Sequence, residues 1–400
     1  MTYTLFAEPN FRRYFKKAIS KQYKQDTYVV CFDNAYIVNE FERGFGVFDK
    51  DFRLVKESLQ TRSNKSQFIP IFSHDNIPYI DKDVVFVGNV NQYFGHFLLE
   101  HMNRIYALMD KKYQNKHIVL INDKNLPVVP DYIFKLLEFF GVRRSNIIIL
   151  NSTTRFKSVC VPSQSFNSRL YTSDSFAKTY DRIAANIPDT QVYDKIYLSR
   201  AMLDDKHKTL GEEKVQKIFE KNGFKIIYPE KLPLKTQISL IKNCSVLAGC
   251  AGTALHLALF MKPGGTVISI KRNRKAACNA MIQNNVNNTK QLHGVFISGS
   301  IEKQKTKHST NAPQIIGVNK YMKQFFDEYK YKYTAKDLDK DMIAWKQYEN
   351  VLHDYSQTHG NAWLRNSKRL VINISSCFVP GRARRNAYRG WLKKVLNYKK

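Results

Sequence analysis

The feature that most constrains the fold is an alternation of short apolar strands and helices over residues 195–270. Such an alternation builds a parallel sheet covered by helices, because each helix returns the chain to the edge where the next strand starts. We therefore expect a doubly wound α/β unit in this region. Its expected strands are 195–199, 224–228, 245–248 and 265–270, and its expected helices are 211–222, 235–242 and 253–261.

Two of these strands end in residues suited to binding a phosphate. The first ends at Arg200, and the third runs into a turn of small residues, 249–254, that opens a helix. The start of a helix presents unpaired N–H groups and a positive dipole end. An arginine at a neighbouring strand end can hold a diphosphate through two parallel hydrogen bonds. The sequence thus predicts a nucleotide site that contains Arg200, Gly249, Cys250, Gly252, Thr253 and Ala254.

Blander interpretations of the same residues stay open from the sequence alone. Arg200 also fits a surface ion pair with Asp204 or Glu230, and the turn also fits a plain strand-to-helix connection capped by Thr253. His256, one turn inside the following helix, is typical of a packing histidine.

The first half of the chain carries a similar alternation. Strands are expected at 84–88, 117–121 and 146–150, helices at 96–109 and 131–140, and a further helix at 173–186 precedes a linker at 187–191. We therefore expect two doubly wound, Rossmann-like α/β domains, followed by a helical and basic C-terminal segment. The predicted domains are 1–187, 188–300 and 301–400, with helices near 319–332 and 337–353 in the last.

The net charge of +30 points to polyanionic neighbours: nucleic acid, anionic lipid or a phosphorylated substrate. From Tyr355 to Lys400 there is no Asp or Glu. On a helix, the tail 382–400 would carry an apolar stripe opposite a cationic face, which favours an anionic membrane surface. A tail packed on its own core, or a disordered one, is the alternative. The stripe consists of Tyr388, Trp391, Leu392, Val395 and Leu396.

The cysteines are widely spaced and form no C-x-x-C pair, so we interpret them as reduced, mostly buried thiols of a cytoplasmic protein. The N-terminus lacks the pattern of a signal peptide, and no stretch is long and apolar enough to span a membrane. The sequence predicts a protein that is soluble or peripheral to the inner face of the cytoplasmic membrane. The cysteines are Cys31, Cys160, Cys244, Cys250, Cys278 and Cys377.

Several motifs together resemble glycosyltransferase family 61. They are Ile196-Tyr-Leu-Ser-Arg200, Asn222-Gly-Phe224, Tyr228-Pro-Glu-Lys-Leu-Pro-Leu234, Gly249-x-x-Gly252-Thr-Ala-Leu255, Pro263-Gly-Gly-Thr-Val-Ile268 and, in the first half, Gly95-His-Phe-Leu-Leu-Glu100. The resemblance covers about residues 84–270. It implies a two-domain GT-B-like fold and an inverting transfer of a sugar from a nucleotide-sugar donor, in pathways that build capsules and other surface polysaccharides.

The resemblance also implies roles for further residues. Lys208 stands where the family usually has Arg. Independently of the resemblance, Glu213 is a candidate to hold a ribose hydroxyl of the donor, and an acid that only stabilises the helix dipole is the alternative. Cys250 stands where family members often have His, which leaves open a catalytically silent relative that acts as an assembly partner.

An inverting transfer needs a base that takes the proton of the acceptor hydroxyl. His96 is our candidate, and Glu100, one helical turn later, would orient its ring or act as the base itself. The alternative is a backbone-bonded His96 with Glu100 paired to Arg104. Asn89 and Asn91, in the preceding loop, are expected to contact the glycan or lipid-linked acceptor.

We expect no metal cofactor. Asp81 and Asp83 have the D-x-D spacing by which many glycosyltransferases hold a divalent cation, but they precede a strand and are interpreted as a solvated turn. A nucleic-acid-binding protein is the remaining class suggested by charge, although no motif of specific nucleic-acid recognition is present.

Overall fold

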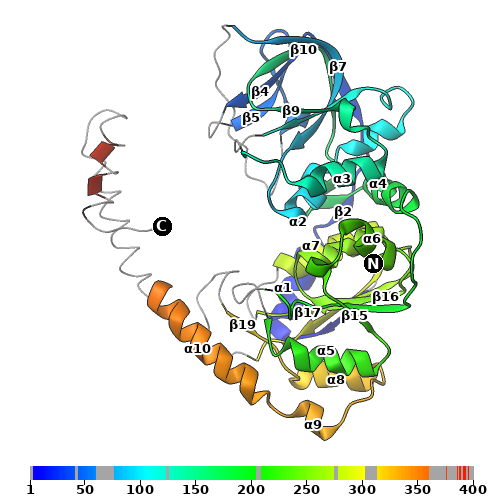
Figure 1. Cartoon of the computed structure of the whole chain (residues 1–400), viewed down its shortest axis with the longest axis vertical. Coiled ribbons are helices and arrows are strands. Elements are labelled where there is room, and N and C mark those ends of the chain that lie inside the picture. The colour runs from blue at the N-terminus through cyan, green and yellow to red at the C-terminus, as the bar shows by residue number, and fades with distance from the viewer. Residues whose placement is uncertain are drawn as a thin grey trace.

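The chain forms two α/β units stacked along the long axis of the molecule (Figure 1). The computed structural model describes residues 3–40, 44–59, 76–122, 126–203, 209–273, 278–301 and 313–359, and residues 375, 385, 387–388, 391–392 and 395 near the C-terminus. The upper unit contains the strands β3 to β10, and the lower unit contains the strands β13 to β18 together with β1.

The lower unit is built on a six-stranded sheet with the order β1-β18-β17-β16-β13-β15, in which every pair is parallel. Counted along the chain from β13, the strands lie in the order 2-1-3-4-5, as in doubly wound sheets. The strands are β13 (Lys195–Leu198), β15 (Lys225–Ile227), β16 (Val246–Cys250), β17 (Thr266–Lys271), β18 (His293–Ser298) and β1 (Tyr3–Phe6). The α/β alternation predicted over 195–270 is thereby confirmed.

Helices cover both faces of this sheet. Tyr197 faces α5 and α8, whereas its neighbours Ile196 and Leu198 face α6, α7 and the upper unit, as the alternation of a strand requires. The helices are α5 (Glu212–Lys221), α6 (Leu234–Ile241), α7 (Cys278–Thr289), α8 (Lys320–Glu328), α9 (Ala335–Leu338) and α10 (Met342–His359).

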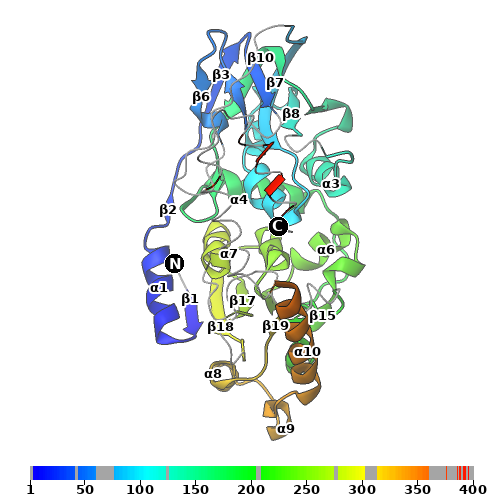
Figure 2. The ribbon, with the colours of Figure 1, turned by 90° about the vertical axis from the view of Figure 1, so that its left-hand side faces the viewer.

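The N-terminal residues belong to the lower sheet, which the sequence did not indicate. β1 pairs in parallel with β18, and α1 (Pro9–Ile19) packs Phe11 and Phe15 against Phe296 and α7. The segment that follows returns the chain to the upper unit through β2 (Tyr23–Lys24), which pairs with β12 (Tyr171–Thr172) (Figure 2).

The upper sheet is mixed, so the prediction of a second doubly wound parallel sheet is correct only in part. β10, β7, β8 and β9 are parallel neighbours, but β3 and β4 pair with β10 antiparallel, and β5 and β6 continue in that sense. β4, β5 and β6 follow one another closely in the chain, and such short connections leave no room for the crossover that parallel pairing needs. The strands are β3 (Val29–Asp33), β4 (Tyr36–Glu40), β5 (Gly44–Phe48), β6 (Leu54–Val55), β7 (Tyr79–Asn89), β8 (His117–Ile121), β9 (Ile147–Leu150) and β10 (Thr154–Pro162).

The helices of the upper unit pack against the lower one. α3 (Asp131–Phe140) ends at Gly141, whose left-handed φ of 108° forms the C-cap. In α4 (Asp174–Ala185), the ring of Tyr180 lies 5.3 Å from that of Phe260 in the lower unit. One apolar cluster therefore runs through both units.

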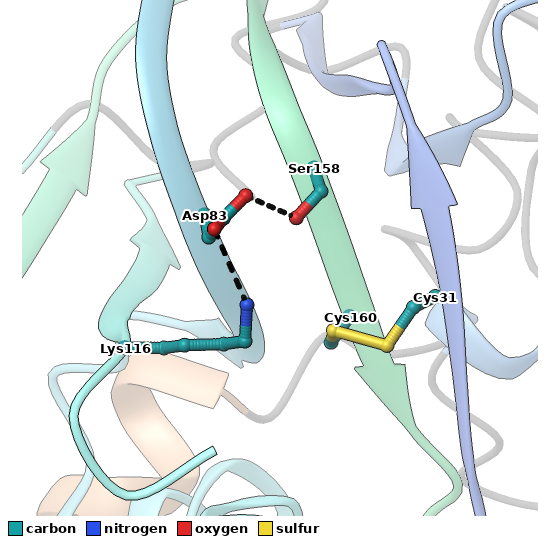
Figure 3. Close-up of a disulfide and its surroundings, with 5 residues drawn as sticks. All are labelled: Cys31, Asp83, Lys116, Ser158 and Cys160. Carbon is teal, nitrogen blue, oxygen red and sulfur yellow. Dashed lines mark hydrogen bonds and ion pairs between the residues drawn. A yellow bond between two sulfur atoms is a disulfide. The ribbon is translucent and has the colours of Figure 1, made fainter. Parts of the chain in front are cut away.

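Cys31 and Cys160 form a disulfide, so the prediction of six reduced cysteines is wrong for this pair. They lie directly opposite each other on the antiparallel strands β3 and β10 (Figure 3). Because 129 residues separate them in sequence, only the register of the sheet reveals the pairing. Cys244 and Cys250 are buried free thiols, and the side chains of Cys278 and Cys377 lie outside the described residues.

The helical C-terminal segment is partly described. α8 and α10 overlap the two expected helices and the short α9 lies between them, whereas most of the tail 382–400 lies outside the described residues. Of its predicted apolar stripe, Trp391 and Val395 are exposed and Leu392 is buried. No helix in the described ranges is both long and apolar enough to cross a bilayer.

Candidate active site

The candidate site begins at the carboxyl edge of the lower sheet, where three adjacent parallel strands end. Arg200 follows β13, the turn 251–254 follows β16, and Arg272 follows β17. The strand order reverses between β13 and β16, and ligands of doubly wound sheets bind at such a switch point. The predicted partners Arg200 and the turn are thus brought together, and Arg272 joins them.

Two guanidinium groups converge on Gly252. A Cβ atom at this position would lie 3.2 Å from Nη1 of Arg200 and 3.7 Å from Nη2 of Arg272. Arg272 is anchored to the turn, since its Nε donates to the carbonyl oxygen of Ala251 at 2.8 Å. Burial, with the nearby charge of Arg200, lowers the pKa of Arg272 to about 10, so the Arg272 guanidinium is a cation at neutral pH. Two like charges held together create an anion site.

Glu212, at the start of α5, is the buried counter-charge beneath this pair. Its Oε1 accepts from the backbone N–H of Arg200 and from the hydroxyl of Tyr197, each at 3.2 Å. Burial raises the pKa of this carboxyl to about 7, although Arg200 and Arg272 favour its ionised form. Glu212 thus places one carboxyl group beneath the two guanidinium groups.

The remaining donor-site predictions have different outcomes. Glu213 lies exposed on α5, next to the residue that bonds Arg200, and Lys208 lies outside the described residues. Cys250 is buried beneath the turn with its Sγ 4.0 Å from the hydroxyl of Tyr197, so its side chain faces the core. Gly249 is required by packing, since a Cβ there would lie 2.7 Å from the carbonyl oxygen of Leu198.

The segment after the turn is a 3₁₀-helix, Thr253–Phe260, instead of the expected α-helix. Its N-cap is Gly252 and carries no side-chain cap, so the prediction that Thr253 caps the helix is wrong. Thr253 is exposed, and Ala254 packs against the shared apolar cluster. His256 bonds Gln283 at 3.1 Å, and burial lowers its pKa to about 4, which makes it a neutral packing histidine at pH 7.

The candidate base comes from the upper unit. Nδ1 of His96 lies 3.3 Å from Oε1 of Glu100, and the imidazole is 45% exposed while the carboxylate is 14% exposed. An accessible ring held by a shielded carboxylate is the arrangement expected of a general base and its orienting group. Arg104 is instead fully buried, where it donates to the carbonyl oxygens of Pro162, Glu57 and Leu59.

The helix predicted at 96–109 is broken, and the break positions this pair. α2 (Phe94–His96) continues into a π-helical turn, Phe97–His101, and then into a 3₁₀-helix, Ile105–Met109. π-Helical turns are rare and occur frequently at functional sites. The wider turn still buries Phe97, Leu98 and Leu99 on the core side.

The two halves of the site meet at Gly95. A Cβ atom on Gly95 would lie 2.7 Å from Cγ2 and 2.9 Å from Oγ1 of Thr253. Only a glycine permits this approach, which places His96 beside the turn that Arg200 and Arg272 flank. Figure 1 shows α2 at the boundary of the two units, next to α6 and α7.

Asn89 and Asn91, predicted to contact the acceptor, are both buried. Oδ1 of Asn91 accepts from the backbone N–H of Tyr93 at 2.8 Å, and its Nδ2 lies 3.3 Å from Nε2 of His101. These contacts hold the loop before α2 in place. Asn91 therefore helps to fix the segment that carries His96.

Asp81 and Asp83 lie within β7, not in the solvated turn that the sequence predicted. Asp83 accepts from the hydroxyl of Ser158 at 2.6 Å and pairs with Lys116 at 3.6 Å (Figure 3), and Asp81 pairs with Lys157 at 3.8 Å. Within the described ranges, no group of three or more His, Cys, Asp or Glu side chains is placed to hold a metal ion.

Sequence reasoning missed Glu212 and Arg272. Arg272 carried the same signal as Arg200, because it is a basic residue shortly after a buried strand. The expected strand 265–270 ends two residues before it. Glu212 carried no such signal, since acidic residues at helix starts are common and usually exposed.

The comparison with protein families matches the region that contains both halves of this site. Residues 94–268 match the protein-family model described as Glycosyltransferase 61. The match begins at Phe94, directly before Gly95 and His96, and ends within β17. No curated protein sequence matches the chain significantly.

Proposed function

Because residues 94–268 make this chain a member of glycosyltransferase family 61, we propose that it is an inverting glycosyltransferase with a GT-B-like arrangement of its two units. The donor is a nucleotide sugar, and the acceptor is a hydroxyl of a growing surface glycan of the capsule type or of a glycolipid. The observation that carries the proposal is the contact of Gly95 with Thr253, which joins a candidate base to a cationic anion site.

The lower unit binds the diphosphate of the donor. Arg200 and Arg272 neutralise the charge that accumulates on the nucleoside diphosphate as its bond to the anomeric carbon breaks. The N–H of Ala251 is bonded to the carbonyl oxygen of Ile270, so the backbone N–H groups proposed to face the same anion are those of residues 252–254. These fixed cations do the work that a divalent metal does in other glycosyltransferases, so we propose metal-independent transfer. Lys208 and Glu213 are proposed as further donor contacts.

The upper unit activates the acceptor. With Nδ1–H of His96 donated to Glu100, Nε2 carries the lone pair that takes the proton of the acceptor hydroxyl. The acceptor oxygen forms its bond to the anomeric carbon on the face opposite the departing diphosphate, so the configuration inverts. Asn89 and Asn91 are proposed to support the acceptor side.

The first experiment is a thermal-shift screen of the full chain against UDP, GDP, CMP and dTDP and their sugars. A ligand that binds only the native state raises the melting temperature. We expect one nucleotide to shift it, and Arg200→Ala and Arg272→Ala each to weaken that nucleotide about tenfold to a hundredfold. Arg53→Ala, at a guanidinium that is 80% exposed in the upper unit, is the matched control.

Absence of a shift for every nucleotide in the folded protein contradicts the donor site. Donor binding without turnover, in contrast, supports a catalytically silent assembly partner. An equal loss of the nucleotide thermal shift in Arg200→Ala, Arg272→Ala and the control Arg53→Ala indicates that the overall positive charge alone attracts the nucleotide. Salt-dependent binding of DNA with no nucleotide shift would support a polyanion-binding protein instead.

We further propose that the basic tail 382–400 holds the enzyme at the inner face of the cytoplasmic membrane, near a lipid-linked acceptor. Co-sedimentation of the full chain and of a chain ending at residue 381 with anionic and neutral vesicles tests this. The Cys31–Cys160 disulfide is the one observation that weighs against this compartment, because disulfides are rare in the cytoplasm. Thiol labelling of Cys31 and Cys160 in cells therefore tests the compartment: labelled thiols support it, and an oxidised pair contradicts it.

A further inference from the structure

Helix α7 separates the candidate active site from a second surface. On one side, Gln283 bonds His256 at 3.1 Å, next to the turn 251–254. Another side carries Met281, Asn285 and Asn288, spaced i, i+4 and i+7 along one helical face. These three residues line two neighbouring hollows of about 300 Å³ each, between α7, α1 and the β2–β12 pair. Figure 2 shows α1 and β2 beside α7.

The first hollow, which we call the basic hollow, is lined by Lys17, Lys21 and Arg169 and by no acidic residue. Within the part of the chain that the structure describes, none of these three side chains has an ion-pair partner. Tyr14, 55% exposed, forms part of the wall. Three uncompensated cations in a concave surface attract an anionic group.

The second hollow, which we call the amide hollow, is lined largely by uncharged side chains. Its lining includes the ring of Tyr23, which is 51% exposed, and the side-chain amides of Gln22, Asn285, Asn288 and Gln291. Its lysine, Lys24, is neutralised by Asp174 at 2.7 Å.

Asn288 supplies an independent indication of a ligand. Its Nδ2 is buried and has no hydrogen-bond partner among the described residues. Buried donors are nearly always paired, so this amide group stays without an acceptor unless it rotates toward a molecule bound in the hollow.

The protein surface between the two hollows is held in place by hydrogen bonds of Gln22 and Asn285. Nε2 of Gln22 donates to the carbonyl oxygen of Met281 at 3.1 Å, and its Oε1 accepts from Asn284 at 3.0 Å. Nδ2 of Asn285 donates to the carbonyl oxygens of Asn167 and Tyr171 at 2.8 and 3.1 Å. A ligand that spans both hollows therefore meets a fixed surface and pays little ordering cost.

We propose that the two hollows together form a second binding site for an acidic oligosaccharide, distinct from the transfer site. The proposal rests on the proposed function in one respect: the oligosaccharide is a distal part of the acceptor glycan. A carboxylate or other anionic substituent occupies the basic hollow, while sugar hydroxyls bond the side-chain amides of Asn288 and Gln291 and a sugar ring packs on Tyr23. A uniformly charged polyanion fits less well, since the amide hollow offers it no unpaired cation.

The test measures binding of a hyaluronan oligosaccharide of about six sugars, in which each carboxylate-bearing sugar alternates with a neutral one, with a neutral malto-oligosaccharide of similar length for comparison, by calorimetry on the full chain. Loss of two lysine contacts predicts about tenfold weaker binding of the acidic probe to Lys17→Gln/Lys21→Gln. Lys16→Gln, on the same helix but outside the hollow, is the matched control and is expected to bind as the wild type does. Tyr23→Ala is expected to weaken binding without changing its salt dependence.

Equal weakening by Lys16→Gln and by the double variant overturns the proposal, because it shows attraction by the overall charge. Absence of binding of the acidic probe also overturns it. The proposal is overturned as well if the protein binds anionic vesicles more tightly than the acidic probe and Lys17→Gln/Lys21→Gln weakens both by the same factor. The nucleotide thermal shift must be unchanged in the double variant. A protein that shifts with a nucleotide but fails these tests loses only the second site, whereas absence of any nucleotide shift contradicts the proposed function itself.

Discussion

Glu212 offers the sharpest test of the buried charge cluster beneath the candidate donor site. Its side chain is fully buried, and it bonds the backbone N–H of Arg200 at 3.2 Å. Burial raises the pKa of this carboxyl from an ordinary value of 4.5 to about 7, against the opposing effect of Arg200. A carboxyl group that holds its proton in the native state and loses it in the unfolded chain makes stability depend on pH.

The direction of the effect follows from proton counts. Below pH 4.5 the carboxyl is protonated in both states, so the stabilisation is fully present; between pH 4.5 and about 7 only the native state keeps the proton. The free energy of unfolding therefore falls as the pH rises through this window. The difference between about 7 and 4.5, at about 1.36 kcal/mol per pKa unit, corresponds to about 3 kcal/mol.

The assay is urea unfolding at pH 5 and pH 8 for the wild type, Glu212→Gln and Glu213→Gln. Glutamine does not titrate, so Glu212→Gln should remove about 3 kcal/mol of the wild type's loss of stability across this range. The additional N–H group of glutamine costs stability at both pH values, so only the change with pH is diagnostic. Glu213→Gln, at the exposed neighbour, should keep the wild-type dependence. The same pH dependence in Glu212→Gln and wild type would refute this assignment.

Three further predictions concern the interface, the disulfide and the base. Gly95→Ala should lower stability by about 1–3 kcal/mol through the clash with Thr253, and Gly95→Ala/Thr253→Ala should recover most of it in urea unfolding; an additive double variant would contradict the contact. The Cys31–Cys160 bond closes a span of 129 residues, so replacing both cysteines by alanine should cost up to about 5 kcal/mol by chain entropy, and an unchanged urea midpoint would contradict it. His96→Ala should lower kcat about 10²- to 10⁴-fold and leave the nucleotide thermal shift intact; near-normal kcat would exclude it as the base.

The sequence by itself determined the elements whose signals are local. The apolar runs of residues 195–270 predicted strands and helices close to those observed. α3 ends at Gly141 because a left-handed C-cap favours glycine. Arg200 and the turn 249–254 were identifiable because the carboxyl ends of neighbouring parallel strands share one edge of a sheet. His96 and Glu100 were paired correctly, since four residues span one helical turn even though the helix is broken there.

Only the tertiary structure decided what depends on contacts distant in sequence. The pairing of β1 with β18, the antiparallel half of the upper sheet and the Cys31–Cys160 bond all follow from strand register, which no local pattern encodes. Burial likewise distinguished Glu212 from its exposed neighbour Glu213, although both are acids at the start of the same helix. The contact of Gly95 with Thr253 exists because two units fold against each other, and it is this contact that makes one site from two halves.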